Sequence, residues 1–88
     1  MKSVEYTVKN SIGLHARPAA IFVKKANEFT SEIEIKKENK TANAKSIINV
    51  MSLGAIKGSN LTIQAKGDDE NEAVESLVEL LDSFVEDF

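Results

Sequence analysis

Residues 13–37, GLHARPAAIFVKKANEFTSEIEIKK, contain the change of hydrophobic period that decides the fold. In the first part of this stretch, apolar residues recur every three or four positions, as on the buried face of a helix: Ala19, Phe22, Val23 and Ala26, with Phe29 one turn beyond. From Ile33 onward, apolar and charged residues alternate, as in a strand with one buried face. The stretch therefore predicts a helix that leads into a half-buried strand.

Three more segments around this stretch carry strand patterns. Alternating apolar residues predict strands over residues 4–8 and 61–65. Residues 38–39, Glu-Asn, predict the turn of a hairpin, and residues 41–44 predict its weaker return strand. Together with the strand that begins near Ile33, these segments supply the strands of one small sheet.

Two further helices are predicted from their ends. Ser46 precedes a short apolar run and Gly54 follows it, as expected for a short helix with a serine N-cap and a glycine after its last turn. Residues 67–69, Gly-Asp-Asp, are expected to cap the last helix, whose first turn is acidic. The apolar stripe of this last helix contains Ala73, Leu77, Leu80, Leu81 and Phe84.

The order βαββαβα predicts an α+β, open-faced β-sandwich: a four-stranded antiparallel sheet covered on one face by three helices. The other face, with residues such as Glu32, Glu34 and Thr62, can meet water. The chain has 88 residues, of which 42% are hydrophobic and 28% charged, a composition typical of one small globular domain. We therefore expect a single domain over residues 1–88.

The composition also excludes several classes of function. The chain has no cysteine and one histidine, which excludes thiolate sites and zinc sites built from several imidazoles. Its net charge of −3 argues against general nucleic-acid binding. No apolar run approaches the ~20 residues needed to cross a bilayer, and the N-terminal residues do not form a signal peptide. We expect a cytoplasmic protein that holds no metal or cofactor and does not insert into a membrane.

The single histidine, arginine and proline of the chain lie together at His15, Arg17 and Pro18. Because proline is tolerated in the first turn of a helix, the helix should begin just before Pro18, with His15 at or beside its N-cap. The free N–H groups and the positive helix end then form an anion site. They keep His15 neutral, with one ring nitrogen free as a nucleophile, while Arg17 can bind phosphate oxygens. A lone histidine at a helix start is more often a capping or surface residue, so both interpretations stay open.

Two segments of the chain resemble the HPr family, the histidine-containing phosphocarriers of the phosphoenolpyruvate-dependent sugar phosphotransferase system. GLHARPAA, residues 13–20, is similar to the phosphorylation-site segment of this family. KSIINVMSLGAIKG, residues 45–58, is similar to the regulatory-serine segment of its Gram-positive-type members. The predicted order of elements and the length match the whole family domain. The resemblance implies a carrier with no turnover of its own, rather than an enzyme.

The resemblance implies a role for each residue of the first segment. His15 matches the histidine that accepts a phosphoryl group on Nδ1 from enzyme I, which phosphoenolpyruvate charges. The group then passes to the A domains of the sugar-specific enzymes II. Arg17 matches the arginine that assists this transfer, and Ala16 and Arg17 match the positions whose backbone N–H groups face the phosphate.

The second segment implies regulation at Ser46. This residue matches the serine that HPr kinase/phosphorylase modifies. In the family, phosphorylation of this serine hinders charging of the histidine by enzyme I and promotes binding to a catabolite-control transcription regulator. A phosphate at Ser46 would add about −1.5 to −2 charge at the start of the short helix. Ser46 can equally be a plain N-cap, and the two roles are compatible.

The resemblance also implies a surface around His15 on which partner proteins dock. It would consist of Lys24, Lys45, Ile47, Ile48 and Met51. The two lysines would form a small basic rim near Arg17, and an exposed apolar patch with a flexible methionine suits several partners in turn. We expect a monomer, because such a carrier must dock several proteins.

Other positions near this surface are assigned differently. Val50 and Leu53 are expected in the core, since a short helix buries one side. Asn27 and Asn49 stand where some family members carry lysines that steer acidic partners, so electrostatic steering should be weaker here.

Two other functions are alternatives to the carrier. One is a serine-regulated binding module that acts on a transcription regulator without carrying phosphate; related proteins of that type lack the histidine, which is present here as His15. The other is a small hydrolase of acylphosphatase type, which would need a phosphate loop with a paired asparagine and has no use for a histidine at a helix start.

Overall fold

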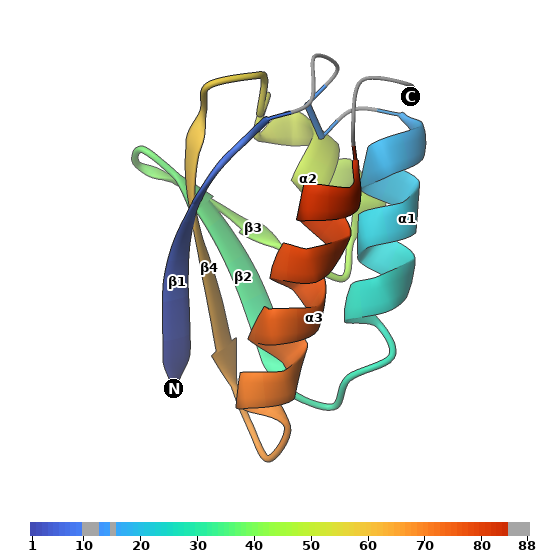
Figure 1. The fold of residues 1–88 in the computed structure, drawn as a ribbon, viewed down its shortest axis with the longest axis vertical. Helices are drawn as coiled ribbons and strands as arrows, with labels where there is room; N and C mark the ends of the chain where they lie inside the picture. The colour runs from blue at the N-terminus through green and yellow to red at the C-terminus, as the bar shows by residue number, and fades with distance from the viewer. Residues whose placement is uncertain (10–12, 15, 85–88) are drawn as a thin grey trace.

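The computed structural model describes residues 1–9, 13–14 and 16–84, and its elements follow the predicted order (Figure 1). The strands are β1 (Lys2–Thr7), β2 (Glu32–Lys37), β3 (Lys40–Asn43) and β4 (Asn60–Lys66). The helices are α1 (Arg17–Ala26), α2 (Ile47–Ser52) and α3 (Glu70–Ser83). His15, the candidate phosphate acceptor, lies outside the described residues, immediately before Ala16 in the sequence.

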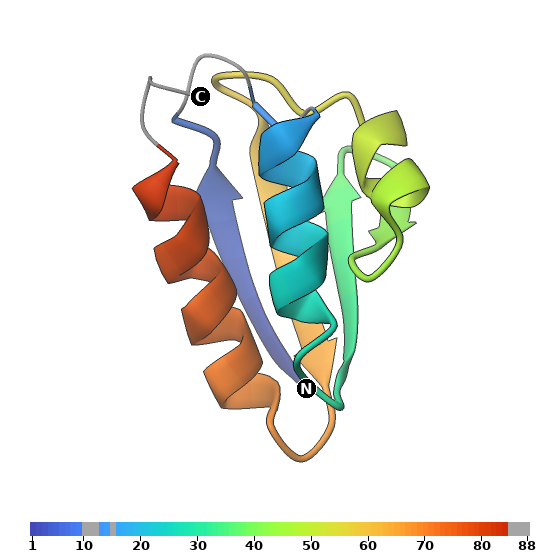
Figure 2. The same cartoon turned by 90° about the vertical axis from the view of Figure 1, so that its right-hand side faces the viewer.

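The strands form one antiparallel sheet in the order β1-β4-β2-β3, so that β1 and β3 are its edges. All the described helices lie on one face of the sheet, with α1 between α2 and α3 (Figure 2). The central strand β4 places Ile63 between Val4 of β1 and Ile35 of β2. This arrangement confirms the predicted α+β, open-faced sandwich.

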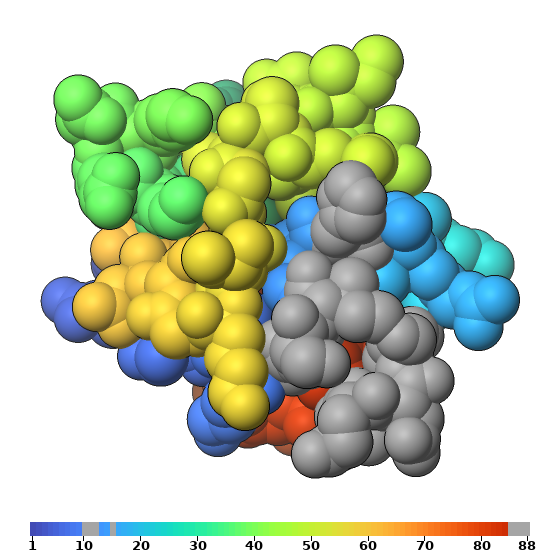
Figure 3. Space-filling model, turned by 90° about the horizontal axis from the view of Figure 1, so that it is seen from above, coloured from blue at the N-terminus to red at the C-terminus, as the bar shows by residue number. Residues whose placement is uncertain are grey.

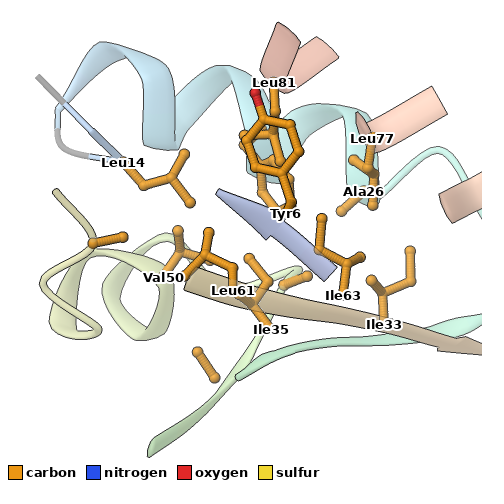
Figure 4. Close-up of a cluster of buried hydrophobic side chains, with 14 of the residues drawn as sticks. Tyr6, Leu14, Ala26, Ile33, Ile35, Val50, Leu61, Ile63, Leu77 and Leu81 are labelled. Carbon is orange, nitrogen blue, oxygen red and sulfur yellow. The ribbon is translucent and has the colours of Figure 1, made fainter. Parts of the chain in front are cut away.

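The core fills the space between the sheet and the helices (Figure 4). Its strand side chains alternate along the sequence because successive residues of a strand point to opposite faces. Val50 and Leu53 are buried, which confirms the prediction for the short helix. The largest fully buried side chains include Phe22, Phe84, Leu14, Ile35, Leu61, Ile63 and Leu77.

α1 begins at Arg17, one residue before Pro18, as the proline predicted. The missing N–H of Pro18 costs no helical hydrogen bond in the first turn. The predicted stripe is buried at Ala19, Phe22 and Ala26, and Val23 is partly buried. The helix therefore lies with its apolar face on the sheet and its N-terminus at the end of the molecule where β1 ends.

The hairpin between β2 and β3 turns through residues 38–39, as predicted, and its return strand is one residue earlier than expected. Lys37, the last residue of β2, donates hydrogen bonds to the carbonyl oxygens of Leu53 and Gly54, at 3.3 and 3.1 Å from Nζ. Gly54 follows the C-cap Leu53 with a φ of 67°, the left-handed conformation that commonly ends a helix. Lys37 therefore provides hydrogen-bond donors for the carbonyl groups that follow α2, and Gly54 ends the helix.

The start of α3 differs from the prediction in one respect. Asp69 occupies the N-cap position, but its carboxylate does not cap the helix. It accepts the N–H groups of Thr30 and Ser31, at 2.9 and 3.0 Å, and the hydroxyl of Ser31. The hydroxyl hydrogen bond, followed by the Thr30 amide, lowers the pKa of Asp69 to about 2. Asp69 is therefore at the N-cap, within the predicted residues 67–69, but its carboxylate binds the loop before β2 instead of the helix N–H groups.

Candidate functional site

The segment that leads to position 15 is fixed against the loop that follows α2. Gly13 has a φ of +74°, and a Cβ atom built on it would lie 2.2 Å from the carbonyl oxygen of Ala55. The N–H of Leu14 donates to that same oxygen at 3.1 Å, and the Leu14 side chain is 2% exposed. A glycine and a buried leucine thus anchor the chain immediately before His15.

Ala16, on the other side of position 15, has a strained backbone. It is the N-cap residue of α1, with a φ of 52° and a ψ of −116°. Residues with a side chain rarely adopt this conformation, and such strain costs on the order of 1–3 kcal/mol and is concentrated at functional sites. The carbonyl oxygen of Ala16 accepts the N–H of Ala20 at 3.0 Å, the first hydrogen bond of α1. Nothing in the sequence around Ala16 indicated this conformation.

Arg17 is exposed in the first turn of α1. This turn contains no acidic residue, and within the described ranges no ion pair engages the Arg17 guanidinium. The unpaired N–H groups of a helix start and a free guanidinium attract anions, and the guanidinium binds two phosphate oxygens at once. The end of α1 can therefore hold a phosphate group beside position 15.

The exposed faces of α1 and α2 lie next to this site. Arg17 and Lys24 are seven residues apart in α1, so they share one exposed face of the helix. Ile47 and Ile48, at the start of α2, are 40% and 76% exposed, and Met51 is partly buried against the core. The structure therefore brings Lys24, Ile47 and Ile48 to the surface, while Met51 offers only part of its side chain.

Lys45 is placed differently from the predicted basic rim. Its Nζ donates to the carbonyl oxygen of Phe29 at 2.6 Å, and its own carbonyl oxygen accepts from Nδ2 of Asn27 at 3.2 Å. Both contacts lie at the C-terminal end of α1, whereas Arg17 lies at the N-terminal end. The structure does not bring Lys45 and Arg17 together; it uses Lys45 to hold the start of α2 against the end of α1.

Ser46 is the N-cap of α2, as predicted. Its Oγ accepts the backbone N–H of Asn49 at 3.4 Å and the side-chain amide of Asn49 at 3.0 Å. Ser46 is partly exposed. Asn49 therefore contacts the serine directly, which its position in the sequence alone did not indicate.

Sequence analysis missed one exposed apolar residue at this end of the molecule. Ile56, in the loop after α2, is 63% exposed, and its Cα lies within 2.8 Å of the position a Gly13 Cβ would take. Figure 3 shows this loop, α2 and the start of α1 on the same end of the molecule. The available signal was an isoleucine in a short segment bounded by Gly54 and Gly58, where the loop offers no regular buried face.

The described part of the chain contains no candidate metal site and no membrane-spanning helix. Across residues 1–9, 13–14 and 16–84, no three or more side chains of the metal-ligating types gather in one place. None of the helices in these ranges combines the length and the apolar character needed to cross a bilayer.

The described structure is a small open-faced sandwich in which the first turn of α1 holds Arg17 and no acidic residue. Residues 2–83 match the family model described as the PTS HPr component phosphorylation site. The chain therefore belongs to the HPr family, whose members are phosphocarrier components of the sugar phosphotransferase system. Both the family and its carrier class agree with the expectation from the sequence.

Individual relatives support the same assignment. The HPr-like protein Crh of Halalkalibacterium halodurans is 52% identical over 81 residues, which cover 92% of this chain and 94% of that protein. The phosphocarrier protein HPr of Lysinibacillus sphaericus is 47% identical over 81 residues, 92% of each chain. The crystal structure of HPr-C-His from Thermoanaerobacter tengcongensis superposes with a TM-score of 0.93 at 51% identity, covering 96% of this chain and 94% of the other.

Proposed function

We propose that this protein carries a phosphoryl group on Nδ1 of His15, taking it from enzyme I and giving it to the A domains of enzymes II. The proposal rests chiefly on Arg17, which is exposed in a first turn of α1 without acidic residues, two positions after His15, in a chain of the HPr family. The match over residues 2–83 supports one HPr-like domain across residues 1–88. The carrier would act in the cytoplasm as a monomer.

The transfer step needs a neutral imidazole. The lone pair on Nδ1 attacks the phosphorus atom held by enzyme I; the new N–P bond forms as the bond to the donor breaks, and the donor leaves with that electron pair. The backbone N–H groups of Ala16 and Arg17 and the guanidinium would hold the phosphate oxygens. The partners supply general catalysis, so the carrier needs only a cradle and a docking surface.

Partner proteins would dock on the exposed faces of α1 and α2. Arg17 and Lys24 offer positive charge, and Ile47, Ile48 and the exposed part of Met51 offer apolar area. Such a patch suits enzyme I and several enzyme II domains in turn, because apolar contacts adapt to different partners. Lys45 would support this surface through the start of α2 rather than contact the partner with its ammonium group.

Ser46 would be the regulatory site, modified by an HPr kinase/phosphorylase. Its partial exposure, and its place beside the exposed Ile47 and Ile48, support this assignment. A phosphate there would place about −1.5 to −2 charge on the docking surface and oppose an acidic partner. The phosphorylated form would bind a catabolite-control transcription regulator.

The second candidate function is a serine-regulated module that binds a transcription regulator without carrying phosphate. It is favoured by the matches to proteins named Crh, at 52% identity in Halalkalibacterium halodurans and 50% in Bacillus subtilis. The presence of His15 favours the carrier over this candidate.

Intact-mass spectrometry separates the two functions. The protein is incubated with phosphoenolpyruvate, magnesium and enzyme I, and His15→Ala serves as the matched control. One added phosphate that is lost in acid and retained in base, and that is absent from His15→Ala, supports the carrier. No added mass on a folded protein with an active enzyme I contradicts it; modification of Ser46 by the ATP-dependent kinase would then favour the regulatory module.

A further inference from the structure

An apolar groove runs between the edge strand β1 and helix α3, with a volume of about 380 Å³. We call it the β1–α3 groove. Its floor is formed by Val4 of β1 and by Val74 and Val78 of α3. The hydroxyl of Tyr6 donates to Asp82 at 3.0 Å and Lys9 pairs with the same carboxylate at 2.9 Å, so α3 is held beside β1. The groove is therefore preformed, which lowers the entropic cost of filling it.

The backbone of β1 leaves one side open for pairing. In the order β1-β4-β2-β3, β1 pairs with β4 along residues 2–7 and has no strand on its outer side among the described residues. An unpaired strand edge presents a row of N–H and C=O groups to which another extended chain can add. Side chains of the added strand that point toward the helices would enter the groove.

The rim of the groove is acidic. It carries Glu75 and Glu79 from α3, against the cation Lys2 of β1; Glu5 also borders the groove, but its side chain alternates with that of Val4 and so lies on the opposite face of the sheet. None of these carboxylates belongs to an ion pair within the described ranges. Glu75 and Glu79 are four residues apart in one helix, where like charges repel and weaken the helix. Basic side chains laid along the groove would remove this repulsion.

We infer that the β1–α3 groove binds an extended segment of another protein in which two apolar residues are flanked by basic ones. The segment would add to β1 as a further strand, with its apolar side chains on Val4, Val74 and Val78 and its basic ones beside Glu75 and Glu79. This function is independent of the proposed phosphoryl transfer. α3 and β1 lie on the side of the molecule away from α2 (Figure 2), so the segment leaves the docking surface of α1 and α2 free.

A second copy of the chain fits the groove less well. Two β1 strands paired around a two-fold axis would place Val4 against Val4, but they would also bring Glu75 and Glu79 of both copies together. The two Lys2 side chains cannot neutralise those four carboxylates. The charge of the rim therefore favours a basic partner over self-association.

The test uses the full chain and the fluorescein-labelled peptide Lys-Thr-Val-Lys-Val-Thr-Lys, whose valines and outer lysines share one face of a strand. Fluorescence anisotropy measures affinity, and amide chemical shifts locate the peptide. We expect saturable, salt-sensitive binding with shifts in residues 2–7 and 74–79. The double variant Glu75→Gln/Glu79→Gln should weaken binding at least about fivefold, whereas Glu72→Gln, an exposed carboxylate of the same helix outside the groove, should change it less than about twofold.

Four results would overturn the inference. The first is no saturable binding at millimolar peptide. The second is equal binding of Glu-Thr-Val-Glu-Val-Thr-Glu. The third is a set of chemical-shift changes confined to α1 and α2. The fourth is a dimer of the free protein in sedimentation that Val4→Lys dissociates, which would assign the groove to a second copy. Charging of His15 is unaffected by any of these outcomes, so a failure here is distinct from a failure of the carrier function.

Discussion

The backbone N–H of Leu14 donates a hydrogen bond to the carbonyl oxygen of Ala55, with 3.1 Å between nitrogen and oxygen. This bond joins the segment before α1 to the loop after α2, two parts of the chain that are distant in sequence. Gly13 packs against the same carbonyl group, so both Gly13 and Leu14 contact the loop after α2.

Gly13→Ala should therefore damage stability and function together. The new methyl group would meet the Ala55 oxygen at 2.2 Å, and φ at this position is +74°. We expect a loss of about 2–4 kcal/mol in the free energy of unfolding, measured in urea, and slower charging by enzyme I. Gly58→Ala is the matched control. Its φ is also positive, at +91°, but nothing lies within 4 Å of the new methyl group. Only the backbone strain should therefore lower the free energy of unfolding, by about 1–2 kcal/mol. Equal losses in the two variants would contradict the steric role of Ala55.

Ala16→Gly should raise stability while it impairs transfer. Glycine adopts a φ of 52° and a ψ of −116° more easily than alanine, so the strain is relieved. Glycine also increases the conformational entropy of the unfolded chain, which offsets part of this gain. We therefore expect a net rise of about 1 kcal/mol in the free energy of unfolding. Charging by enzyme I should be slower, because the backbone at the site is less constrained.

The control for this prediction is Ala20→Gly, an exposed position inside the same helix. A normal helical position should lose about 1 kcal/mol on the same change. If Ala16→Gly is destabilised as much as Ala20→Gly, Ala16 is not strained in solution.

Asp69 should make the fold sensitive to acid. The hydroxyl of Ser31, followed by the amide of Thr30, lowers the pKa of the Asp69 carboxyl to about 2 in the folded state, against about 4 in the unfolded chain. A lowered folded-state pKa adds stability above pH of about 4, and this stability is lost as the pH falls from about 4 to about 2. Asp69→Asn should therefore have a lower urea midpoint at neutral pH and a smaller fall of that midpoint in acid. Part of the fall should remain, because hydrogen bonding from Lys9 also lowers the pKa of Asp82.

Ile56→Ser should weaken docking without weakening the fold. The side chain is 63% exposed, so its removal costs the folded state little, and the melting temperature should stay unchanged. If a partner covers it, about 1 kcal/mol of apolar burial is lost and the KM for transfer from enzyme I rises roughly fivefold. Ile48→Ser, at 76% exposure on α2, is the reference for a docking residue. An unchanged KM for Ile56→Ser beside a raised KM for Ile48→Ser would exclude Ile56 from the docking surface.

Local patterns determined the elements and the chemical character of the site. Three features depend on contacts between residues a few positions apart. They are the start of α1 near Pro18, the change of hydrophobic period between α1 and β2, and the ends of α2 at Ser46 and Gly54. Such contacts can be read from a sequence because helix and strand repeats are fixed by backbone geometry. The identity of the candidate phosphate acceptor, His15, likewise comes from the sequence, because His15 lies outside the described residues.

Contacts between distant loops decided the rest. The Asp69 carboxylate binds Ser31, 38 positions away, instead of capping α3, and the Lys45 ammonium binds Phe29 instead of joining Arg17. The close approach of Gly13 to Ala55 exists only because the segment before α1 meets the loop after α2. The sequence determined which residues form helices, strands and a candidate phosphate-binding helix start. The tertiary structure decided which polar groups find partners and which remain free. A polar group binds the best donor or acceptor that the assembled fold brings within reach.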